Sequence, residues 1–483
     1  MKRRLYLETF GCQMNVLDSE LVLNQLRAMG YEQTDTRDTA DVVLFNTCSV
    51  REHAEQKVWS RLGELREARQ TNPTMVIGVI GCMAERDSAD LFRKFPHIDI
   101  LCGPGELDRL PGMVHNAVLN TGTARARQSA LMGKNTRRSA TLHAAEDTLE
   151  SLDLSRSFSP ADGTKQAYVR ITRGCNKFCS YCVVPYTRGP EVHRPPQNII
   201  DEVKKLTDGG HLEVTLLGQT VNHYHYKHPD GRTTSFADLL YQIHEATPHL
   251  PRLRFVTSFP RDFSREALQA MRDCSRICHY LHIPAQSGSD RILRMMNRGY
   301  SADQYLELID TARQLMPDIA IASDFIVGFP TETDDEFQQT VALTAHCRFK
   351  NSFIFKYSPR PGTHAQERYP DDVPEEVKRR RNNELLALQG NICADNNAAM
   401  VGQSVEILVE GEGSLASPPT VDAGHVELAW EKKKQKHPAD HKQLIGRTRG
   451  DQIVAFHADP SQIGKLLTVK ITAARQMTLF AEC

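Results

Sequence analysis

Three cysteines within eight residues constrain this chain more than any other feature of its sequence. Cys175, Cys179 and Cys182 have the spacing C-x3-C-x2-C and directly follow an apolar-alternating run over 167–172. Three thiolates on one tight loop can ligate three irons of an iron–sulfur cube, whereas ferredoxin-type clusters use four cysteines. No fourth cysteine lies nearby in the sequence. The loop therefore predicts a cluster with one iron open to a small molecule.

Two simpler interpretations of these cysteines have to be weighed. The C-x2-C pair is also found in redox dithiols and as half of a zinc site, and a buried cysteine is often only a small apolar residue. The third cysteine argues against a dithiol. Zinc would need a fourth ligand from elsewhere in the chain. An iron–sulfur cluster is the interpretation we favour.

A second cysteine pattern extends over the first 121 residues. Three apolar runs, each followed by a helical pattern or a charged segment, are 5–10, 42–46 and 76–80. Cys12, Cys48 and Cys82 come just after these runs and are 36 and 34 residues apart. Continuous Val/Ile runs separated by helices indicate a parallel α/β sheet. The carboxyl ends of the strands in such a sheet face one crevice. The pattern predicts a second metal site, and three separate core cysteines are the alternative.

The wording around both groups of cysteines resembles a known superfamily. The C-x3-C-x2-C loop, with Tyr181 before its last cysteine, is similar to the signature of the radical S-adenosylmethionine (SAM) superfamily. GCNKFCSYCVVPYTRGPE at 174–191 resembles the MiaB-type tRNA methylthiotransferases within it. So do the segments ETFGCQMNVLDSE, FNTCSVRE and IGCMAER. The GCQMN wording is closer to this branch than to the RimO-like branch, which methylthiolates an aspartate of a ribosomal protein.

The resemblance implies a chemistry and its cofactors. Two [4Fe-4S] clusters are implied, one at Cys175, Cys179 and Cys182, which would chelate and cleave SAM. The other would be an auxiliary cluster, held by Cys12, Cys48 and Cys82, that delivers sulfur, and a second SAM would supply the methyl group. The implied target is carbon 2 of an N6-dimethylallyl adenosine at position 37 of tRNA, beside the anticodon. Its hydrogen is too weakly acidic for a side-chain base, so a cofactor has to carry the chemistry.

Four segments follow from the changes of pattern along the chain. We expect a methylthiotransferase N-terminal domain over 1–121, a linker over 122–160, a radical SAM core over 161–396 and an RNA-binding TRAM domain over 397–476. The linker is rich in Arg, Ser, Thr and Ala and shows no sustained period, which is typical of a segment that is flexible in part.

The central segment alternates strands and helices. Its expected strands are 167–172, 213–217, 254–257, 279–283, 319–327 and 353–357. About six βα units predict a partial (β/α)6 barrel, with its site at the carboxyl ends of the strands. Small or polar residues follow these strands, and by resemblance they line the SAM site, although ordinary βα turns look much the same. They are Gly218, Gln219, Asn222, Ser258, Gln286 and Gly328.

The last segment has short strand patterns separated by glycine-containing turns. The runs 404–410, 425–429, 452–456 and 467–472 predict a small β-barrel, and GRTRGDQIVAF at 446–456 resembles a TRAM domain. A basic cluster lies in or near these runs. It comprises Lys432, Lys433, Lys434, Lys436, Lys442, Arg447 and Arg449. Such a cluster can contact phosphates, although a solvated lysine-rich loop is the more common meaning.

Two further groups invite a metal interpretation that we do not favour. His223, His225 and His228 lie close together in NHYHYKH, but no cysteine or carboxylate stands at ligand spacing beside them. We expect a solvated polar loop. Cys274 and Cys278 are one helical turn apart, and two thiols are too few for a site. We expect them to be buried helix positions.

Length and composition bound the remaining possibilities. A chain of 483 residues has room for about three domains, and its net charge of −1 does not indicate a nucleic-acid partner. Twelve cysteines are too sparse for a disulfide-stapled scaffold. With no signal-peptide pattern and no long uncharged run, we expect a cytoplasmic monomer without membrane contact.

Three functions are consistent with these observations. The first is methylthiolation of tRNA, with the anticodon stem-loop as substrate and a flavodoxin or ferredoxin as reductant. The second is the same chemistry on a ribosomal-protein aspartate. The third is a non-catalytic iron–sulfur protein that binds RNA.

Overall fold

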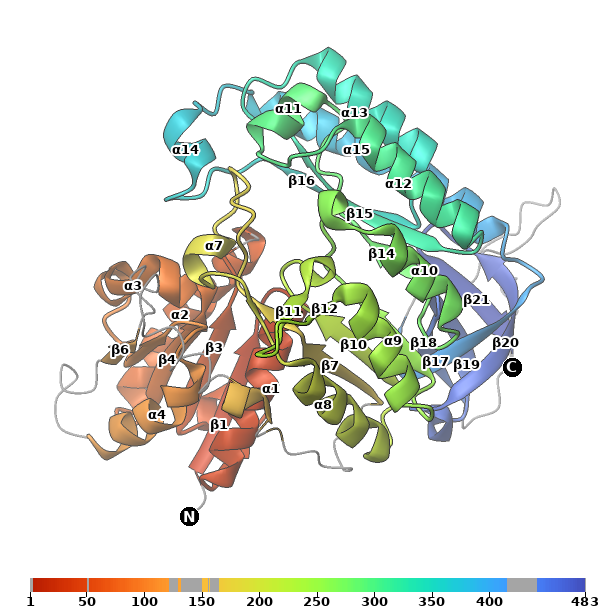
Figure 1. Ribbon diagram of the computed structural model, residues 1–483. Coiled ribbons are helices and arrows are strands. Elements are labelled where there is room, and N and C mark those ends of the chain that lie inside the picture. The colour runs from red at the N-terminus through yellow and green to blue at the C-terminus, as the bar shows by residue number, and fades with distance from the viewer. Residues whose placement is uncertain are drawn as a thin grey trace, which may run out of the picture.

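The computed structural model describes residues 3–49, 52–120, 129–131, 150–154, 156, 165–414 and 441–482. An N-terminal α/β domain, a central domain of strands and helices and a C-terminal barrel follow one another along the chain (Figure 1). The N-terminal domain and the barrel lie on opposite sides of the central domain. The central domain therefore contacts both.

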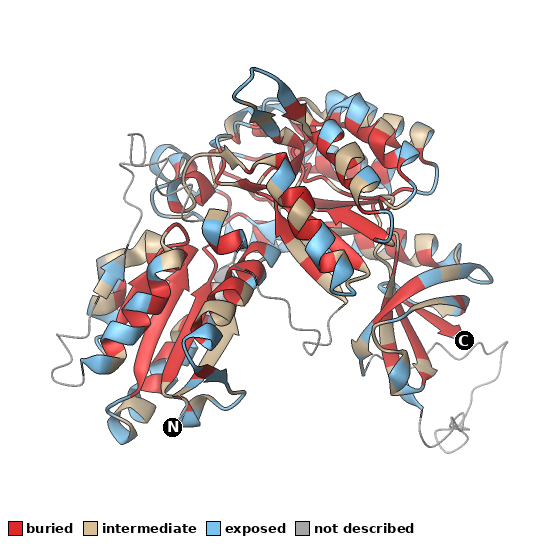
Figure 2. Cartoon of the chain, turned by 60° about the horizontal axis from the view of Figure 1, so that its bottom comes forward, coloured by how far each residue is buried: buried red, intermediate tan, exposed pale blue. Residues whose placement is uncertain are grey.

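The N-terminal domain is a six-stranded sheet in the order β2-β1-β3-β4-β5-β6, and all its pairs are parallel. The strands are β1 (Arg3–Thr9), β2 (Tyr31–Gln33), β3 (Val42–Thr47), β4 (Val76–Gly81), β5 (Ile100–Cys102) and β6 (Ser129–Leu131). The helices are α1 (Gln13–Ala28), α2 (Glu52–Thr71), α3 (Cys82–Lys94) and α4 (Leu110–Leu119). Every residue of β3 and β4 is buried (Figure 2), as expected for parallel strands covered on both faces. The predicted parallel α/β domain is confirmed.

The segment predicted as a linker, 122–160, departs from that prediction in its described parts. Ser129–Leu131 form β6, which pairs with β5 at the edge of the sheet. Asp153 is buried and accepts hydrogen bonds from Arg170, at 2.7 and 3.3 Å. A three-residue strand carries no periodic signal, and the ion pair joins residues 17 positions apart, so composition alone did not reveal either feature.

The central domain contains the six predicted strands, arranged as two parallel three-stranded sheets. Their orders are β13-β10-β7 and β14-β15-β16, and a parallel bridge between Leu253 and Ile277 connects them. The strands are β7 (Gln166–Arg170), β10 (Glu213–Leu217), β13 (Arg252–Phe255), β14 (Tyr280–His282), β15 (Ala320–Val327) and β16 (Asn351–Lys356). This arrangement confirms the predicted partial (β/α)6 barrel.

Helices cover the outside of this partial barrel (Figure 1). They are α8 (Pro196–Asp208), α9 (Phe236–Ala246), α10 (Arg265–Asp273), α11 (Asp290–Met295), α12 (Ala302–Leu315), α13 (Asp334–Cys347) and α15 (Glu375–Ala398). Shorter elements are β8 (Thr172–Arg173), α7 (Val184–Thr187), β9 (Val192–His193), β11 (His225–Lys227), β12 (Thr233–Ser235) and α14 (His364–Arg368). Among the described residues, no helix is both long and apolar enough to cross a bilayer.

The C-terminal domain is a closed five-stranded barrel in the order β17-β18-β19-β21-β20. Its strands are β17 (Ser404–Glu412), β18 (Lys442–Thr448), β19 (Ile453–Ala458), β20 (Leu466–Ala474) and β21 (Thr478–Glu482). The predicted small barrel is confirmed. The strand expected at 425–429 lies outside the described residues, and β18 and β21 were not predicted. Because β21 pairs with both β19 and β20, the barrel continues past the predicted boundary at 476.

Buried arginines attach the barrel to the central domain. Arg252 donates to Oε1 of Glu406 at 3.0 Å, and Arg254 donates to the carbonyl of Thr448 at 2.6 Å. In the opposite direction, Arg449 donates to the carbonyl of Ile277 at 3.1 Å. Charge-assisted hydrogen bonds of this kind are the stronger class, so the barrel has a defined orientation on the central domain.

Candidate active site

The loop of the first cysteine triad lies between β8 and α7 and is folded back on itself. Gly174 has a φ of +67°, and a side chain there would collide with the carbonyl of Pro190. The Cys175 N–H donates to the Gly189 carbonyl at 3.1 Å, and the Cys182 N–H donates to the Cys179 carbonyl at 3.0 Å. Glycine at 174 thus permits a turn that brings the three thiols onto one short loop.

Burial and one arginine determine the electrostatics of this triad. Burial raises the pKa of Cys175 to about 11, and it also raises the pKa of Cys182. Arg298 is buried and places Nη1 at 3.4 Å from Sγ of Cys179 and 3.5 Å from the Tyr181 hydroxyl. Buried thiols become thiolates when a bound metal supplies positive charge, which is the state that ligates iron.

The second triad gathers at the carboxyl ends of β1, β3 and β4. Cys12 precedes α1, Cys48 follows β3 and Cys82 begins α3. A side chain at Gly11, where φ is +118°, would lie 3.1 Å from Sγ of Cys48. A hydrogen bond with Cys48 lowers the pKa of Cys12 to about 6. Burial raises the pKa of Cys82, and the charge of Cys12 raises it further.

Arg188 connects the segment after the first cysteine loop to the second triad. It follows the first cysteine loop in the chain, yet its Nη2 atom lies 2.8 Å from Oδ1 of Asn15 and 2.9 Å from Oδ2 of Asp18 in the N-terminal domain. Its positive charge acts on both Cys12 and Cys82. No local sequence pattern assigns Arg188 a role, because its partners are 173 and 170 residues away.

Asp18 extends this connection into the central domain. It is fully buried and accepts from Arg188 and also from Arg170 of β7, at 2.8 Å. Arg170 continues to Asp153. A continuous series of buried charges therefore sets the position of the N-terminal triad relative to the central domain.

One cavity of about 930 Å³ is lined by Tyr181 and Cys182 of the first cysteine loop. Ser49, the residue after Cys48 of the second triad, also lines it. Its wall also includes the cations of Lys356 and Arg360. A substrate in this cavity would lie against Cys182 and one residue away from Cys48, and a reaction that uses two metal centres needs both near one substrate.

Sequence comparisons place this arrangement among known proteins. Residues 4–103 match the uncharacterized protein family UPF0004, residues 169–344 match the radical SAM superfamily and residues 434–483 match the TRAM domain. A tRNA-2-methylthio-N(6)-dimethylallyladenosine synthase of Rhodopirellula baltica is 43% identical over 99% of this chain and 95% of its own length. The Porphyromonas gingivalis protein of the same name is 40% identical over 100% of this chain and 95% of its own. The chain belongs to the tRNA-2-methylthio-N(6)-dimethylallyladenosine synthase family.

Solved structures support the fold of this family member. The radical SAM methyltransferase TsrM of Kitasatospora setae, solved with tryptophan and a SAM analogue, has a TM-score of 0.52 and 16% identity. The alignment covers 75% of this chain and 75% of TsrM. At this identity the likeness concerns the fold alone.

Three of the six residues predicted to contact SAM lie close against other parts of this synthase-family chain. A side chain at Gly218 would collide with Thr172, and one at Gly328 would collide with Lys378. The Asn222 side chain exchanges two hydrogen bonds with the backbone of Phe259, at 2.7 and 2.9 Å. Gly218 and Asn222 therefore lie where the turn after β10 meets neighbouring turns, and Gly328 lies against Lys378 of α15. Their contact with SAM stays a prediction.

The other three predicted SAM residues differ in their surroundings. Gln286 lines the cavity and has a φ of +70°. Ser258 is buried, and its Oγ has no hydrogen-bond partner among the described residues. Gln219 is half-buried. Gln286 and Ser258 are therefore the better placed of the six for a ligand, although their roles also stay predictions.

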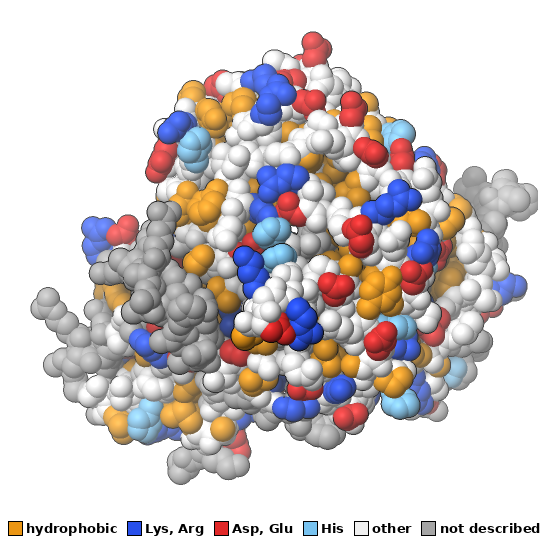
Figure 3. Space-filling view, viewed as in Figure 1, with side chains coloured by type: hydrophobic (Ala, Val, Ile, Leu, Met, Phe, Trp, Pro, Cys, Tyr) orange, Lys and Arg blue, Asp and Glu red, His pale blue; other side chains and the backbone are white. Residues whose placement is uncertain are grey.

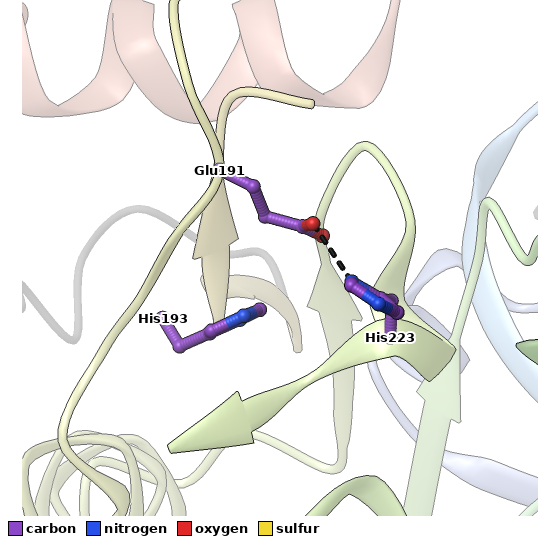
Figure 4. Close-up of side chains that lie close together, drawn as sticks. All are labelled: Glu191, His193 and His223. Atoms are coloured by element: carbon purple, nitrogen blue, oxygen red, sulfur yellow. Dashed lines mark hydrogen bonds and ion pairs between the residues drawn. The ribbon is translucent and has the colours of Figure 1, made fainter. Parts of the chain in front are cut away.

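The expectation for the histidine loop was wrong for one residue. His223 is half-buried, and its Nδ1 lies 2.7 Å from Oε2 of Glu191 (Figure 4). The carboxylate is 32 positions away in the sequence, so no local spacing revealed it. His225 is exposed. Cys274 and Cys278 are buried, as expected, but neither is a helix position, because α10 ends at Asp273 and β14 begins at Tyr280.

Proposed function

We propose that this chain converts N6-dimethylallyl adenosine to its 2-methylthio derivative at position 37 of tRNA. The observation that carries the proposal is the cavity lined both by Cys182 of the first triad and by Ser49, which is next to Cys48 of the second. The names of relatives at 40–43% identity over nearly the whole chain support the same substrate class. Other enzymes that act on a base take it out of its stack, and loop bases are the easiest to extract.

The donor atoms present fit two iron–sulfur clusters and SAM. All six cysteines are free thiols. Buried hydroxyls of Thr172, Ser180 and Ser258 have no hydrogen-bond partner within the described residues, and polar ligands can satisfy such groups. Cys175, Cys179 and Cys182 would hold the cluster that binds SAM, and Cys12, Cys48 and Cys82 would hold the auxiliary cluster. When bound, these groups supply the one-electron chemistry and the sulfur that no side chain here can provide.

The chain's own residues position the reactants and exclude water. Arg298 fixes the first loop by donating to the Pro284 carbonyl at 3.0 Å, beside its contact with Cys179. Phe355 lines the cavity and is 37% exposed. An exposed aromatic ring in a cavity can stack on an extruded base. We assign Phe355 this role.

Cations in the cavity wall are already neutralised within the protein. Arg360 pairs with Glu55 at 3.2 Å, and Lys378 pairs with Asp371 at 2.5 Å. Positive and negative side chains are also interspersed over the face in Figure 3. We infer that backbone contacts to tRNA come from the TRAM barrel and its lysine-rich segment. Lys432, Lys433, Lys434 and Lys436 lie outside the described residues.

Two residues of the predicted basic cluster, Arg447 and Arg449, have partners within the protein, and we do not assign them to contacts with tRNA. Arg447 pairs with Asp451 at 3.0 Å, and Arg449 donates to carbonyls of the central domain. Arg447 therefore stabilises the barrel itself, and Arg449 attaches it to the central domain. A flavodoxin or ferredoxin as reductant, and a monomeric state, complete the proposal.

The proposal is tested with the anaerobically reconstituted chain, SAM, a reductant and tRNA from a strain that lacks the methylthio modification. Mass spectrometry of the digested tRNA should show the 2-methylthio nucleoside, and tRNA without the dimethylallyl group should stay unmodified. Modification of a ribosomal-protein aspartate in place of tRNA would contradict the proposal. Absence of 5′-deoxyadenosine would mean that the chain is not a radical SAM enzyme.

A further inference from the structure

Three side chains that ligate metals in other proteins converge outside both cysteine triads. They are Glu191, His193 of β9 and His223 of the 3-10 turn η4 (Val221–His223). One ligand atom from each lies within 4.8 Å of the other two, and no other group of three or more in the described residues meets this limit. Figure 4 shows the carboxylate and the His223 ring facing each other, with the His193 ring alongside.

We propose that Glu191, His193 and His223 form a binding site for a divalent transition-metal ion of the zinc class. Two imidazoles and one carboxylate are a set of donors found in zinc sites and in non-haem iron sites, where they leave positions open to water. The inference does not depend on the proposed function, because none of the three residues belongs to a cysteine triad.

A hydrogen bond from a neighbouring residue orients the carboxylate. Oε1 of Glu191 accepts from the Thr220 hydroxyl at 2.7 Å, while Oε2 faces His223. Metal-binding carboxylates are commonly held in this way by a partner that does not touch the metal. The Glu191 side chain is 1% exposed and that of His223 is 41% exposed, so an ion can enter from the solvent side.

His193 supplies the observation that is hardest to explain without a ligand. Its Nδ1 is buried and has no hydrogen-bond partner among the described residues. Its ring centroid lies 6.1 Å from that of His223 and 5.6 Å from that of Tyr224. Buried polar atoms are nearly always satisfied in native structures. A bound metal ion would satisfy the imidazole.

Only a small adjustment is needed to admit the ion. The Glu191 and His223 ligand atoms are 2.7 Å apart, whereas two ligands of a tetrahedral zinc at ~2.0–2.1 Å are about 3.3 Å apart. Rotation of the half-buried His223 side chain can supply that difference. The bound ion would then replace the direct hydrogen bond.

The site is connected to the first cysteine loop. The Glu191 N–H donates to Oδ1 of Asn176 at 3.1 Å, and Asn176 lies next to Cys175. Glu191 is also three residues after Arg188 in the chain. A metal here would therefore fasten the segment that follows Cys182, which includes Arg188, to η4.

The test uses the full chain with both clusters reconstituted, dialysed against buffered Zn²⁺. Elemental analysis should give about one zinc per chain beyond the iron of the clusters. His193→Ala and His223→Ala should each lower zinc affinity at least about tenfold, since a change of even a supporting residue costs 10–100-fold. The matched control is His228→Ala in the same loop, whose partner is Thr234 at 2.8 Å. It should retain the zinc.

X-ray absorption at the zinc edge identifies the ligands. The proposal requires nitrogen and oxygen neighbours at ~2.0–2.2 Å, whereas a sulfur shell at ~2.3 Å would mean that zinc had entered a cysteine site and would overturn it. Equal zinc in His193→Ala, His223→Ala and the wild type would also overturn it. Iron is counted in every sample, and Glu191→Gln, which keeps the side-chain shape, replaces any histidine variant that loses iron. Loss of zinc with iron retained in that variant supports the site, and retention of zinc contradicts it.

Discussion

The two cysteine triads are formed in different ways, although Cys182 of one and the residue after Cys48 of the other line the same cavity. Cys175, Cys179 and Cys182 lie on one loop, which a glycine turn and backbone hydrogen bonds close locally. Cys12, Cys48 and Cys82 meet only because three parallel strands end at the same edge of a sheet. The first triad is therefore a property of a short sequence, and the second is a property of a folded domain.

The electrostatic settings differ as well. Burial raises the pKa of Cys175 to about 11, whereas a hydrogen bond with Cys48, aided by the charge of Arg188, lowers the pKa of Cys12 to about 6. The cation at the second triad comes from the other domain. Domain docking thus influences the N-terminal triad directly, and variants can separate the two sites.

The largest effect is expected from Cys175→Ala. Removal of one ligand from the local loop should abolish reductive cleavage of SAM, because the remaining two thiols cannot hold the cube. Formation of 5′-deoxyadenosine under anaerobic conditions measures this. Cys274→Ala changes a buried cysteine of the same domain and should retain cleavage. Substantial cleavage by Cys175→Ala would contradict the assignment of the first triad.

Cys48→Ala should affect sulfur insertion and not the cleavage of SAM. We expect cleavage of SAM to continue while 2-methylthio product is lost, because the sulfur source is removed. The control is Cys102→Ala, a buried cysteine on β5 of the same sheet, which should retain product formation. If Cys48→Ala still formed methylthiolated tRNA, the second triad would have no role in sulfur insertion.

Asp18→Asn tests the connection between the domains. The change removes the carboxylate that buried Arg188 and Arg170 share. We expect a loss of about 3 kcal/mol in the free energy of unfolding. Denaturant unfolding measures it. Asp38→Asn removes an ion pair with Arg37 in which the Asp38 side chain is 73% exposed. It should change stability by less than about 1 kcal/mol. Equal, small effects of both variants would mean that the buried series does not hold the domains together.

The smallest effect is expected from replacing Lys432, Lys433, Lys434 and Lys436 with Gln. Binding of tRNA should weaken, and its logarithmic dependence on salt should become shallower by about 0.7–0.9 for each phosphate that the variant no longer neutralises. Cleavage of SAM should be unchanged, because neither triad includes these lysines. The control is Lys204→Gln, an exposed lysine on α8 of the central domain, which should leave the salt dependence unchanged. An unchanged salt dependence would remove the lysines from the RNA interface.

The sequence predicted what depends on local patterns. Apolar runs revealed β1, β3 and β4, and with them the positions of three cysteines at strand ends. It did not reveal pairs such as Arg188 with Asp18, or Glu191 with His223, because such pairs depend on how distant segments meet. The strand β6 was missed for the same reason, since its partner β5 supplies the hydrogen bonds.

Iron content per chain tests most directly whether the two triads hold separate clusters. After anaerobic reconstitution, the wild type should contain about eight irons, since each [4Fe-4S] cluster contributes four. Replacing all three cysteines of either triad with alanine should leave about four. Loss of all iron from one triple variant, or retention of about eight in either, would contradict two independent clusters.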